Sequence, residues 1–346
     1  MAVRTGPGAE PLRADPVSAA LVTTDVARAV AVLRAGGLVG LPTETVYGLA
    51  ADAADLTAVR RVFEVKGRPA DHPLIVHVAA ADDLDRWADD VSGYARRLAQ
   101  RLWPGPLTLV VPRSDVVADL VTGSQPTVGL RCPAHPVAHA VLAAFGGGVA
   151  APSANRFGRV SPTTATHVLD EVGDRLDPAR DVVLDGGPST VGVESTILDC
   201  TGPAPRVLRR GAVTAQAVLE AGGVAIDEGG ATGGVRAPGM LAAHYAPRAA
   251  VVVTGPDDVV AAASGPAPHR VGLLAPAAVG TPAGVVRLAA PDDETGYARA
   301  LYGALRRADD LRLARVVAVA PTGGELAAAV LDRLHRAAVG SGGTPA

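Results

Sequence analysis

Short hydrophobic runs alternate with amphipathic stretches along the first part of the chain, and this pattern predicts an α/β domain. Continuous apolar runs are typical of buried strands, and apolar positions three or four apart are typical of helices. Because the elements do not follow strict βαβ alternation, we expect a twisted mixed sheet with flanking helices over residues 23–218. Strands are expected at 38–41, 74–78, 107–111, 127–131, 149–151, 182–184 and 195–198, and helices at 24–34, 56–65, 93–102, 136–145 and 163–172.

A second pattern of strands and helices begins at residue 249 and predicts a smaller Rossmann-like α/β domain over 249–346. Its first strand is not followed by G-x-G-x-x-G, so nothing suggests dinucleotide binding. Strands are expected at 250–254, 271–274, 285–288 and 316–319, and helices at 257–263, 294–305 and 325–338.

Two segments lie outside these patterns. Residues 1–22 are rich in proline and alanine, and we expect a flexible N-terminus. Residues 219–248 form a candidate linker, because six glycines fall between residues 222 and 234. Glycine also lowers the cost of moving between backbone states, so this linker is a candidate lid.

Composition narrows the class of protein. A length of 346 residues suits two domains, and 48% hydrophobic residues can fill their cores. A net charge of −3 argues against a broad basic face for nucleic acid. No apolar run reaches the ~18 residues of a membrane span, and residues 1–16 lack the apolar region of a signal peptide. Cys132 and Cys200 lack CxxC spacing, which excludes a disulfide framework and a thiolate zinc site. We expect a cytoplasmic protein.

Two residue types occur once each. The chain has a single lysine, Lys66, and a single asparagine, Asn155, although arginine and alanine are abundant. Under such a compositional bias a singly used residue is a candidate for function, although chance placement remains open. Both residues fall inside polar motifs.

The first polar motif, PTETVYGL at 42–49, follows a predicted buried strand. Ligands collect outside strand ends in open α/β sheets, and Thr43, Glu44 and Thr45 offer hydroxyls and a carboxylate there. A capped strand-to-helix turn explains the segment equally well.

The second motif, KGRPADHPLIVH at 66–77, places two cations on a proline-fixed loop after a helix. Arg68 can bind a phosphate through its fork, Lys66 as a point charge, and His77 can face the same cavity. A solvated charged turn is the alternative.

Further motifs carry polar residues at strand ends. Arg131 closes an apolar strand, so its partner is either a protein carboxylate or a ligand carboxylate. APSAN at 151–155 follows a strand and SPT at 161–163 opens a helix, where hydroxyls and amides suit phosphate, although Ser161 also fits a plain N-cap. LRRG at 208–211 adds a cationic turn, whereas WPGPLT at 103–108 fits an aromatic anchor and Cys132 fits a packing residue.

These motifs, taken in order, resemble the YrdC family of threonylcarbamoyl-AMP synthases. The similarity covers about residues 24–215, and APGM at 237–240 with HYAP at 244–247 resembles the long two-domain members. The motifs are PTETVYGL, KxRPxxxPLIVH, WPGPLT, TVGLRxP, APSAN, SPT, DGG, GVESTI and LRRG.

The resemblance implies a nucleotidyltransferase that uses ATP, bicarbonate and L-threonine. N-carboxythreonine would attack the α-phosphate, releasing pyrophosphate and starting N6-threonylcarbamoyladenosine formation at position 37 of tRNAs that read ANN codons. Mg²⁺ would be held mainly by the phosphates. A tRNA threonylcarbamoyl transferase would be the downstream partner, with indirect or weak contact to tRNA itself.

The resemblance also implies site residues. Lys66, Arg68 and Arg131 would be catalytic, with Arg131 holding the threonine carboxylate. Position 72 is often asparagine in long relatives, so the role of His72 is an open point. The threonine site would comprise Thr45, His77, Arg131, Ala151 and Ser195, and the ATP site Lys66, Arg68, His72, Thr127, Ser153, Asn155, Ser161, Arg209 and Tyr245.

Three other functions compete. A non-catalytic dsRNA- or tRNA-binding module fits the fold but not the acidic charge or the scarcity of aromatics. A carbamoyl-adenylate enzyme of hydrogenase maturation would carry an acylphosphatase-like domain and zinc-finger cysteines, which this sequence lacks. An inactive regulator would not need these polar residues.

Overall fold

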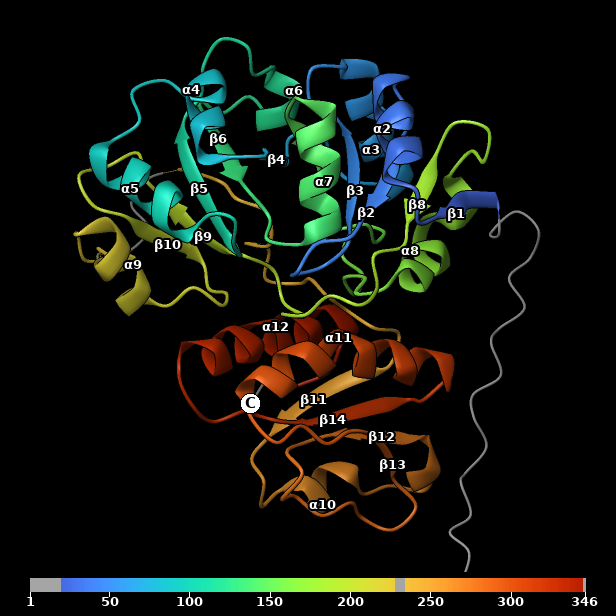
Figure 1. Cartoon of the computed structure of the whole chain (residues 1–346). Coiled ribbons are helices and arrows are strands. Elements are labelled where there is room, and N and C mark those ends of the chain that lie inside the picture. The colour runs from blue at the N-terminus through green and yellow to red at the C-terminus, as the bar shows by residue number, and fades with distance from the viewer. Residues whose placement is uncertain (1–19, 228–233, 345–346) are drawn as a thin grey trace, which may run out of the picture.

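A mixed ten-stranded sheet forms the centre of the larger lobe in the computed structural model, which describes residues 20–227 and 234–344 (Figure 1). The strand order is β1-β8-β2-β3-β7-β4-β6-β5-β9-β10. The strands are β1 (Val22–Thr23), β2 (Val39–Leu41), β3 (Gly48–Asp52), β4 (Ile75–His77), β5 (Leu107–Pro112), β6 (Thr127–Arg131), β7 (Val149–Ala150), β8 (Val182–Leu184), β9 (Thr196–Asp199) and β10 (Arg206–Arg209).

Parallel and antiparallel pairs both occur in this sheet, which confirms the predicted mixed α/β class. β2 pairs parallel with β8 but antiparallel with β3, and β6 pairs parallel with β4 but antiparallel with β5. The lobe's helices are α2 (Val26–Arg34), α3 (Leu56–Lys66), α4 (Leu84–Trp87), α5 (Gly93–Leu102), α6 (Asp119–Thr122), α7 (Pro136–Phe145), α8 (Ala165–Val172) and α9 (Ala215–Gly222).

Helix α3 shows how the sequence sets an element's limits. The Asp55 side chain accepts hydrogen bonds from the first-turn amides, and Gly67 ends the helix in a left-handed conformation. Val59, Val62 and Phe63 face the core. α3 therefore delivers Lys66 in its last turn, not on a loop as the sequence suggested.

A four-stranded parallel sheet with the order β11-β14-β12-β13 forms the centre of the smaller lobe, which confirms the predicted second α/β domain. Helices α11 and α12 cover the face of this sheet that is turned toward the larger lobe, and α10 lies on the opposite face (Figure 1). The elements are β11 (Ala250–Thr254), α10 (Val259–Ala263), β12 (Val271–Leu274), β13 (Val286–Ala289), α11 (Glu294–Asp310), β14 (Arg315–Val319) and α12 (Glu325–Ser341).

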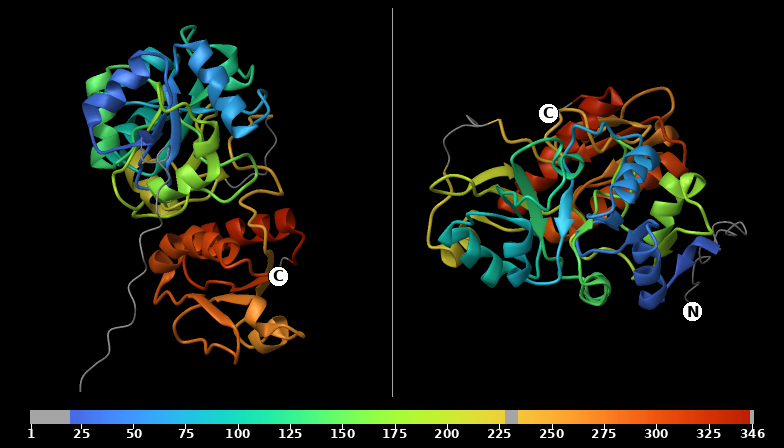
Figure 2. Two further views of the ribbon diagram at one scale, coloured as in Figure 1. Left: turned by 90° about the vertical axis from the view of Figure 1, so that its right-hand side faces the viewer. Right: turned by 90° about the horizontal axis from the view of Figure 1, so that it is seen from above.

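The two lobes share one apolar cluster. Val46, Val160 and Val193 of the larger lobe pack in the same cluster as Tyr302 and Leu334 of α11 and α12. Figure 2 shows these helices lying directly beneath the larger lobe. The described residues between the lobes thus lead into a packed interface, not a loose tether.

The structure adds elements that the sequence pattern did not predict: β1, β3, β10, α4, α6 and α9. After Pro42 the chain turns into β3, which pairs antiparallel with β2, so the expected strand-to-helix alternative is wrong. Helix α9 runs to Gly222, across the predicted domain end at residue 218. Residues 1–19 of the predicted flexible N-terminus and residues 228–233 of the predicted lid lie outside the described residues.

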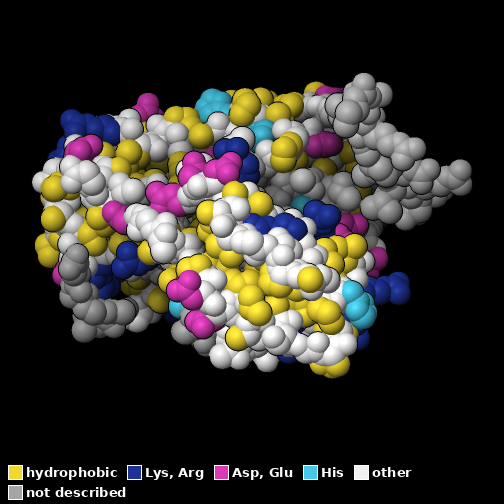
Figure 3. All heavy atoms as spheres, turned by 90° about the horizontal axis from the view of Figure 1, so that it is seen from below, with side chains coloured by type: hydrophobic (Ala, Val, Ile, Leu, Met, Phe, Trp, Pro, Cys, Tyr) yellow, Lys and Arg dark blue, Asp and Glu magenta, His cyan; other side chains and the backbone are white. Residues whose placement is uncertain are grey.

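Charged side chains of both signs mix on the face formed mainly by the smaller lobe (Figure 3). This face therefore has no single broad basic field of the kind that binds a nucleic-acid backbone. Among the described helices, none has both the length and the apolar character needed to cross a bilayer.

Candidate active site

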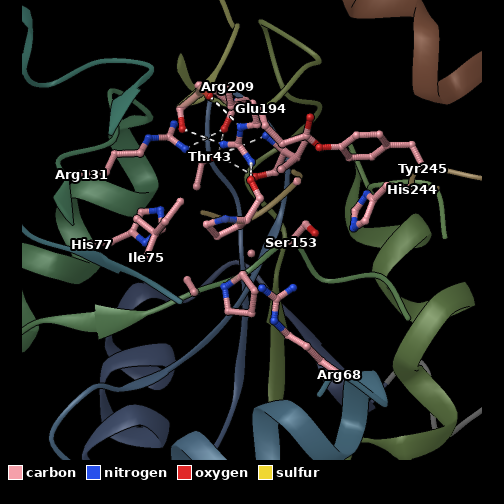
Figure 4. Close-up of a pocket in the computed structure, with 18 residues that line it drawn as sticks. Thr43, Arg68, Ile75, His77, Arg131, Ser153, Glu194, Arg209, His244 and Tyr245 are labelled. Atoms are coloured by element: carbon pink, nitrogen blue, oxygen red, sulfur yellow. Dashed lines mark hydrogen bonds between the residues drawn. The ribbon is translucent and has the colours of Figure 1, made fainter. Parts of the chain in front are cut away.

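A cavity opens where strand ends of the larger lobe meet the segment that leads to the smaller lobe (Figure 4). Its walls come from the β2–β3 turn, the loop after α3, the ends of β4, β6 and β10, and residues 238–245. Its lining residues are Thr43, Thr45, Val46, Gly48, Arg68, Ile75, His77, Arg131, Ala151, Pro152, Ser153, Glu194, Ser195, Arg209, Pro238, Gly239, His244 and Tyr245.

Arg131 stands at one end of this cavity. Its Nη1 donates to Thr45 Oγ1 at 2.9 Å, and its Nη2 lies 2.8 Å from Glu44 Oε1. Nε and Nη2 nevertheless make no aligned hydrogen bond with any described residue. Nη2 is occupied by the ion pair with Glu44, and Nε is the donor that remains for a ligand carboxylate. Both partners that the sequence left open are therefore compatible with the geometry.

His77 and Ser195 flank Arg131. Burial lowers the pKa of His77 to about 3, and the neighbouring Arg131 adds to this effect. The imidazole is neutral at physiological pH, and its Nδ1 has no partner among the described side chains. Ser195 Oγ lies 2.8 Å from Thr108 Oγ1 and accepts a hydrogen bond from Arg209 Nη2 at 3.1 Å. This end of the cavity offers neutral polar groups around one cation.

Lys66 does not line the cavity. Its Nζ donates to the backbone carbonyls of Ser153 and Asn155, both at 2.5 Å, and the side chain is buried. Burial lowers its pKa well below the usual value, and the neighbouring Arg68 acts in the same direction. Lys66 therefore fastens the loop after β7 that carries Ser153 into the cavity.

Arg68 reaches the cavity with much of its hydrogen-bonding capacity free. Nη2 donates to the carbonyl of Pro73 at 3.0 Å, whereas Nε has no partner in the described structure. Its guanidinium lies 5.8 Å from the ring centroid of Phe157, which also contacts the rings of His72 and His244. His72 thus supports the wall behind Arg68 and does not itself line the cavity.

Arg209 and Tyr245 form the opposite wall. Arg209 is buried and donates to the carbonyls of Ser195 and Pro238 at 3.1 Å each. Tyr245 is 1% exposed, and its hydroxyl has no partner among the described residues although it faces the cavity. An unpartnered buried hydroxyl suits a ligand hydrogen bond.

All five residues proposed for threonine line this one cavity, together with four proposed for ATP: Arg68, Ser153, Arg209 and Tyr245. Thr127 lines a smaller adjoining pocket instead. Asn155 donates to the carbonyls of Arg156 and Arg159, and Ser161 donates to Glu194 Oε1 at 2.6 Å. The other four residues proposed for ATP do not line the cavity but contact its walls from behind: Lys66, His72, Asn155 and Ser161.

Several residues of the site were missing from the sequence-based list. Glu44 lies in PTETVYGL and Glu194 in GVESTI. The sequence does not indicate that Glu44 pairs with Arg131, or that Glu194 pairs with a residue of the smaller lobe. His244 stands beside Tyr245 in HYAP and could have been included on that ground. Gly239 and Pro238 come from APGM, and only the fold shows that they close the cavity.

A mixed sheet with such a cavity at its strand ends, followed by a second α/β lobe, defines the class of protein. The chain belongs to the Sua5/YciO/YrdC family, whose model, described as "Telomere recombination", matches residues 31–211. A second model, described as "Threonylcarbamoyl-AMP synthase, C-terminal domain", matches residues 212–339. The family predicted from the motifs is confirmed.

Individual relatives agree with this assignment. Threonylcarbamoyl-AMP synthase of Pyrococcus abyssi is 44% identical over 233 residues, covering 66% of this chain and 67% of the relative. The protein of the same name from Bacillus subtilis is 40% identical over 232 residues and 66% of each chain. The crystal structure described as P. abyssi Sua5 complexed with L-threonine has a TM-score of 0.81 and 38% identity, covering 91% of this chain and 94% of that one.

Proposed function

We propose that this protein makes threonylcarbamoyl-AMP from L-threonine, bicarbonate and ATP with release of pyrophosphate. The observation that carries this proposal is the unpartnered Nε of Arg131 in a cavity that also holds Arg68 and Arg209. One carboxylate site and two further cations in one cavity suit an amino acid next to a polyphosphate. The relatives named above, one of them solved with L-threonine, support the same activity.

The threonine end of the cavity is assigned to Thr45, His77, Arg131, Ser195 and the backbone of Ala151. Arg131 binds the substrate carboxylate, and the Thr45 hydroxyl holds the guanidinium in place. His77 is neutral, so it can accept a hydrogen bond from the substrate's amine or hydroxyl without adding charge. The hydroxyl of Ser195 completes the polar groups at this end of the cavity.

The nucleotide end is assigned to Arg68, Ser153, Arg209 and Tyr245. Arg68 and Arg209 face the phosphates, and Lys66 with Asn155 acts through the loop that carries Ser153. Thr127 in the adjoining pocket, together with His72 and Ser161 behind the walls, completes this assignment.

The proposed reaction has two steps. The amine of threonine attacks bicarbonate, which loses water and gives N-carboxythreonine. The new carboxylate then attacks the α-phosphate of ATP, and the bond to the leaving pyrophosphate breaks. Both steps depend on placing anions side by side, and the cavity's arginines stabilise the charge that develops at phosphorus.

Mg²⁺ fits this scheme as a companion of the phosphates. Within the described residues, no three His, Cys, Asp or Glu side chains gather as a protein metal site. Glu194 also has both carboxylate oxygens engaged by Ser161, Tyr302 and Arg333. The cation would neutralise phosphate charge, while the protein binds the same phosphates through arginine.

In this proposal the enzyme is a nucleotidyltransferase acting in the cytoplasm, where ATP and tRNA are present. Its product passes to a tRNA threonylcarbamoyl transferase, which completes N6-threonylcarbamoyladenosine at position 37 of tRNAs that read ANN codons. Contact with tRNA itself is indirect or weak.

Pyrophosphate release tests the proposal directly. We expect ATP-dependent release that requires threonine and bicarbonate together and stops when either is omitted. Release that ignores both would contradict the assignment. Salt-dependent tRNA binding without any ATP turnover would favour a nucleic-acid-binding module instead.

A further inference from the structure

A buried carboxylate joins the two lobes directly behind the cavity. Glu194 accepts hydrogen bonds from Ser161 at 2.6 Å and from the Tyr302 hydroxyl at 3.0 and 2.8 Å. Arg333 Nε donates to Glu194 Oε2 at 3.2 Å. Ser161 belongs to the larger lobe, whereas Tyr302 and Arg333 lie on α11 and α12 of the smaller lobe. Glu194 is therefore held mainly by residues from the other lobe.

The carboxylate stays ionised in this position. Burial alone would raise the pKa of Glu194, but Arg333 and Arg209, together with the hydrogen bonds from Ser161 and Tyr302, lower it to about 2. Arg333 itself has no exposed surface. A buried ion pair of this kind is a poor source of stability but a precise geometric constraint.

Tyr245 is packed against the same two residues. The Arg333 guanidinium lies 5.7 Å from the centroid of the Tyr245 ring, and the Tyr302 ring lies 5.6 Å from it. The backbone of Tyr245 has φ 60°, a left-handed conformation that a bulky residue adopts only when its surroundings enforce it. Arg333 and Tyr302 supply the packing against this ring from the side of the smaller lobe.

The contacts with Tyr302 and Arg333 involve cavity-lining residues at one end of the cavity only. Glu194 and Tyr245 line it, whereas Tyr302 and Arg333 do not. Thr45, His77 and Arg131 lie in the larger lobe, and among the described residues they make no hydrogen bond or ion pair with α11 or α12. The smaller lobe therefore supports the end where Tyr245 lies and leaves the Arg131 end to the larger lobe.

We propose that Tyr302 and Arg333 are positioning residues through which the smaller lobe sets Glu194 and Tyr245 for nucleotide binding. This inference rests on the proposed function, because it takes the Tyr245 end as the nucleotide end. It assigns the C-terminal domain a share in substrate binding beyond covering the cavity.

The test uses the full chain and two variants. Tyr302→Phe removes a single hydroxyl, and Arg333→Met removes the charge at similar length. Arg287→Met is the matched control, because Arg287 donates to three backbone carbonyls within the smaller lobe and contacts no described residue of the larger one. Affinity is measured by calorimetry with α,β-methylene-ATP and, separately, with L-threonine.

We expect both variants to bind the ATP analogue at least about tenfold more weakly, because a small displacement of binding groups is costly. Threonine affinity should stay within about twofold, since its end of the cavity is intact. The control should bind both ligands like the unmodified chain. Equal analogue binding by all proteins, or equal loss for threonine and analogue, would overturn the proposal.

If Arg333→Met proves unstable, a double-mutant cycle with other variants still tests the proposal. Glu194→Gln combined with Tyr302→Phe should cost little more than either change alone, because the two groups act as a unit. Additive losses in analogue affinity would count against the inference. Failure of the proposed function is separately visible, since the unmodified chain would then release no threonine-dependent pyrophosphate.

Discussion

Single cations in the cavity and behind its walls differ in the number of protein partners that they already have. Lys66 binds two carbonyls and is buried, whereas Arg68 binds one carbonyl and keeps a free Nε. Arg131 donates to the Thr45 hydroxyl and forms an ion pair with Glu44. The same truncation to alanine should therefore affect folding and binding to different extents at each position.

Arg68→Ala should impair ATP use without loosening the fold. Loss of a charge-assisted phosphate contact costs roughly 1.5–3 kcal/mol, or about ten- to hundredfold in kcat/KM for ATP. Lys66→Ala should cause a similar loss but also lower the Tm, because two buried carbonyls lose their donor. Steady-state kinetics and thermal melting measure both effects. Normal turnover in both variants would remove these residues from the site.

Arg131→Gln should weaken threonine binding by about ten- to hundredfold, because the carboxylate loses its cation. It should also lower the Tm, since Glu44 is left as a buried charge without its partner. The double variant Glu44→Gln/Arg131→Gln should regain stability but not affinity, as measured by melting and calorimetry. If threonine affinity is unchanged while the Tm falls, Arg131 is a structural ion-pair residue.

The sequence predicted many site residues because polar groups at strand ends are conspicuous within apolar runs. Arg131 and Arg68 are examples, and both line the cavity. The sequence could not distinguish residues that face the cavity from those that hold its walls, because this depends on rotation of a few side chains. Ser161, Asn155 and Lys66 contact the cavity walls from behind for that reason.

Among the elements, apolar strand runs and capped helices were the most predictable. β6, α5 and α7 have the expected limits. β3 escaped prediction because its residues, Gly48–Asp52, include none of the β-branched or aromatic types that are enriched in strands. A short strand of Gly, Leu and Ala has no polar alternation to reveal it.

The segment from Pro238 to Tyr245 depends on one glycine. Gly239 has φ 85°, and a methyl group there would lie 2.7 Å from the Tyr245 hydroxyl. Gly239→Ala should therefore displace Tyr245 and weaken ATP-analogue binding by about tenfold, while threonine binding persists. Gly187→Ala is the control, with φ 82° but no heavy atom within 4 Å, so it introduces backbone strain without a clash. Equal effects of both variants would show that strain alone is responsible.

The whole molecule is held together by an interface, not by a chain connection alone. Val46, Val160 and Val193 share a core with the smaller lobe, and Arg159 pairs with Asp309 at 3.1 Å. We expect the full chain to unfold in a single calorimetric transition, because neither lobe completes this core alone. A chain ending at Asp227 should still bind threonine but melt at a lower temperature. Two separate transitions in the full chain would contradict this coupling.

Stability should also depend on pH through two buried imidazoles. Burial lowers the pKa of His77 and of His244 to about 3, whereas an unfolded histidine titrates near about 6.5. Between these values the unfolded chain binds more protons, so stability falls as the pH drops below about 6.5. The Tm should be lower at pH 5 than at pH 7, and His77→Gln/His244→Gln should reduce that difference. An unchanged difference would show that other groups dominate the acid sensitivity.

Because both lobes hold the Glu194 carboxylate beside the nucleotide end of the cavity, bound nucleotide should stabilise the contact between the lobes. Coupling between two events is reciprocal, so if closing the joint around Glu194 strengthens ATP binding, ATP must strengthen the joint by the same free energy. Mild urea or warming that first loosens the joint would therefore release nucleotide while threonine is retained. Saturating nucleotide, in turn, would shift the concentration of urea at which the lobes part, and the amino acid alone would shift it less.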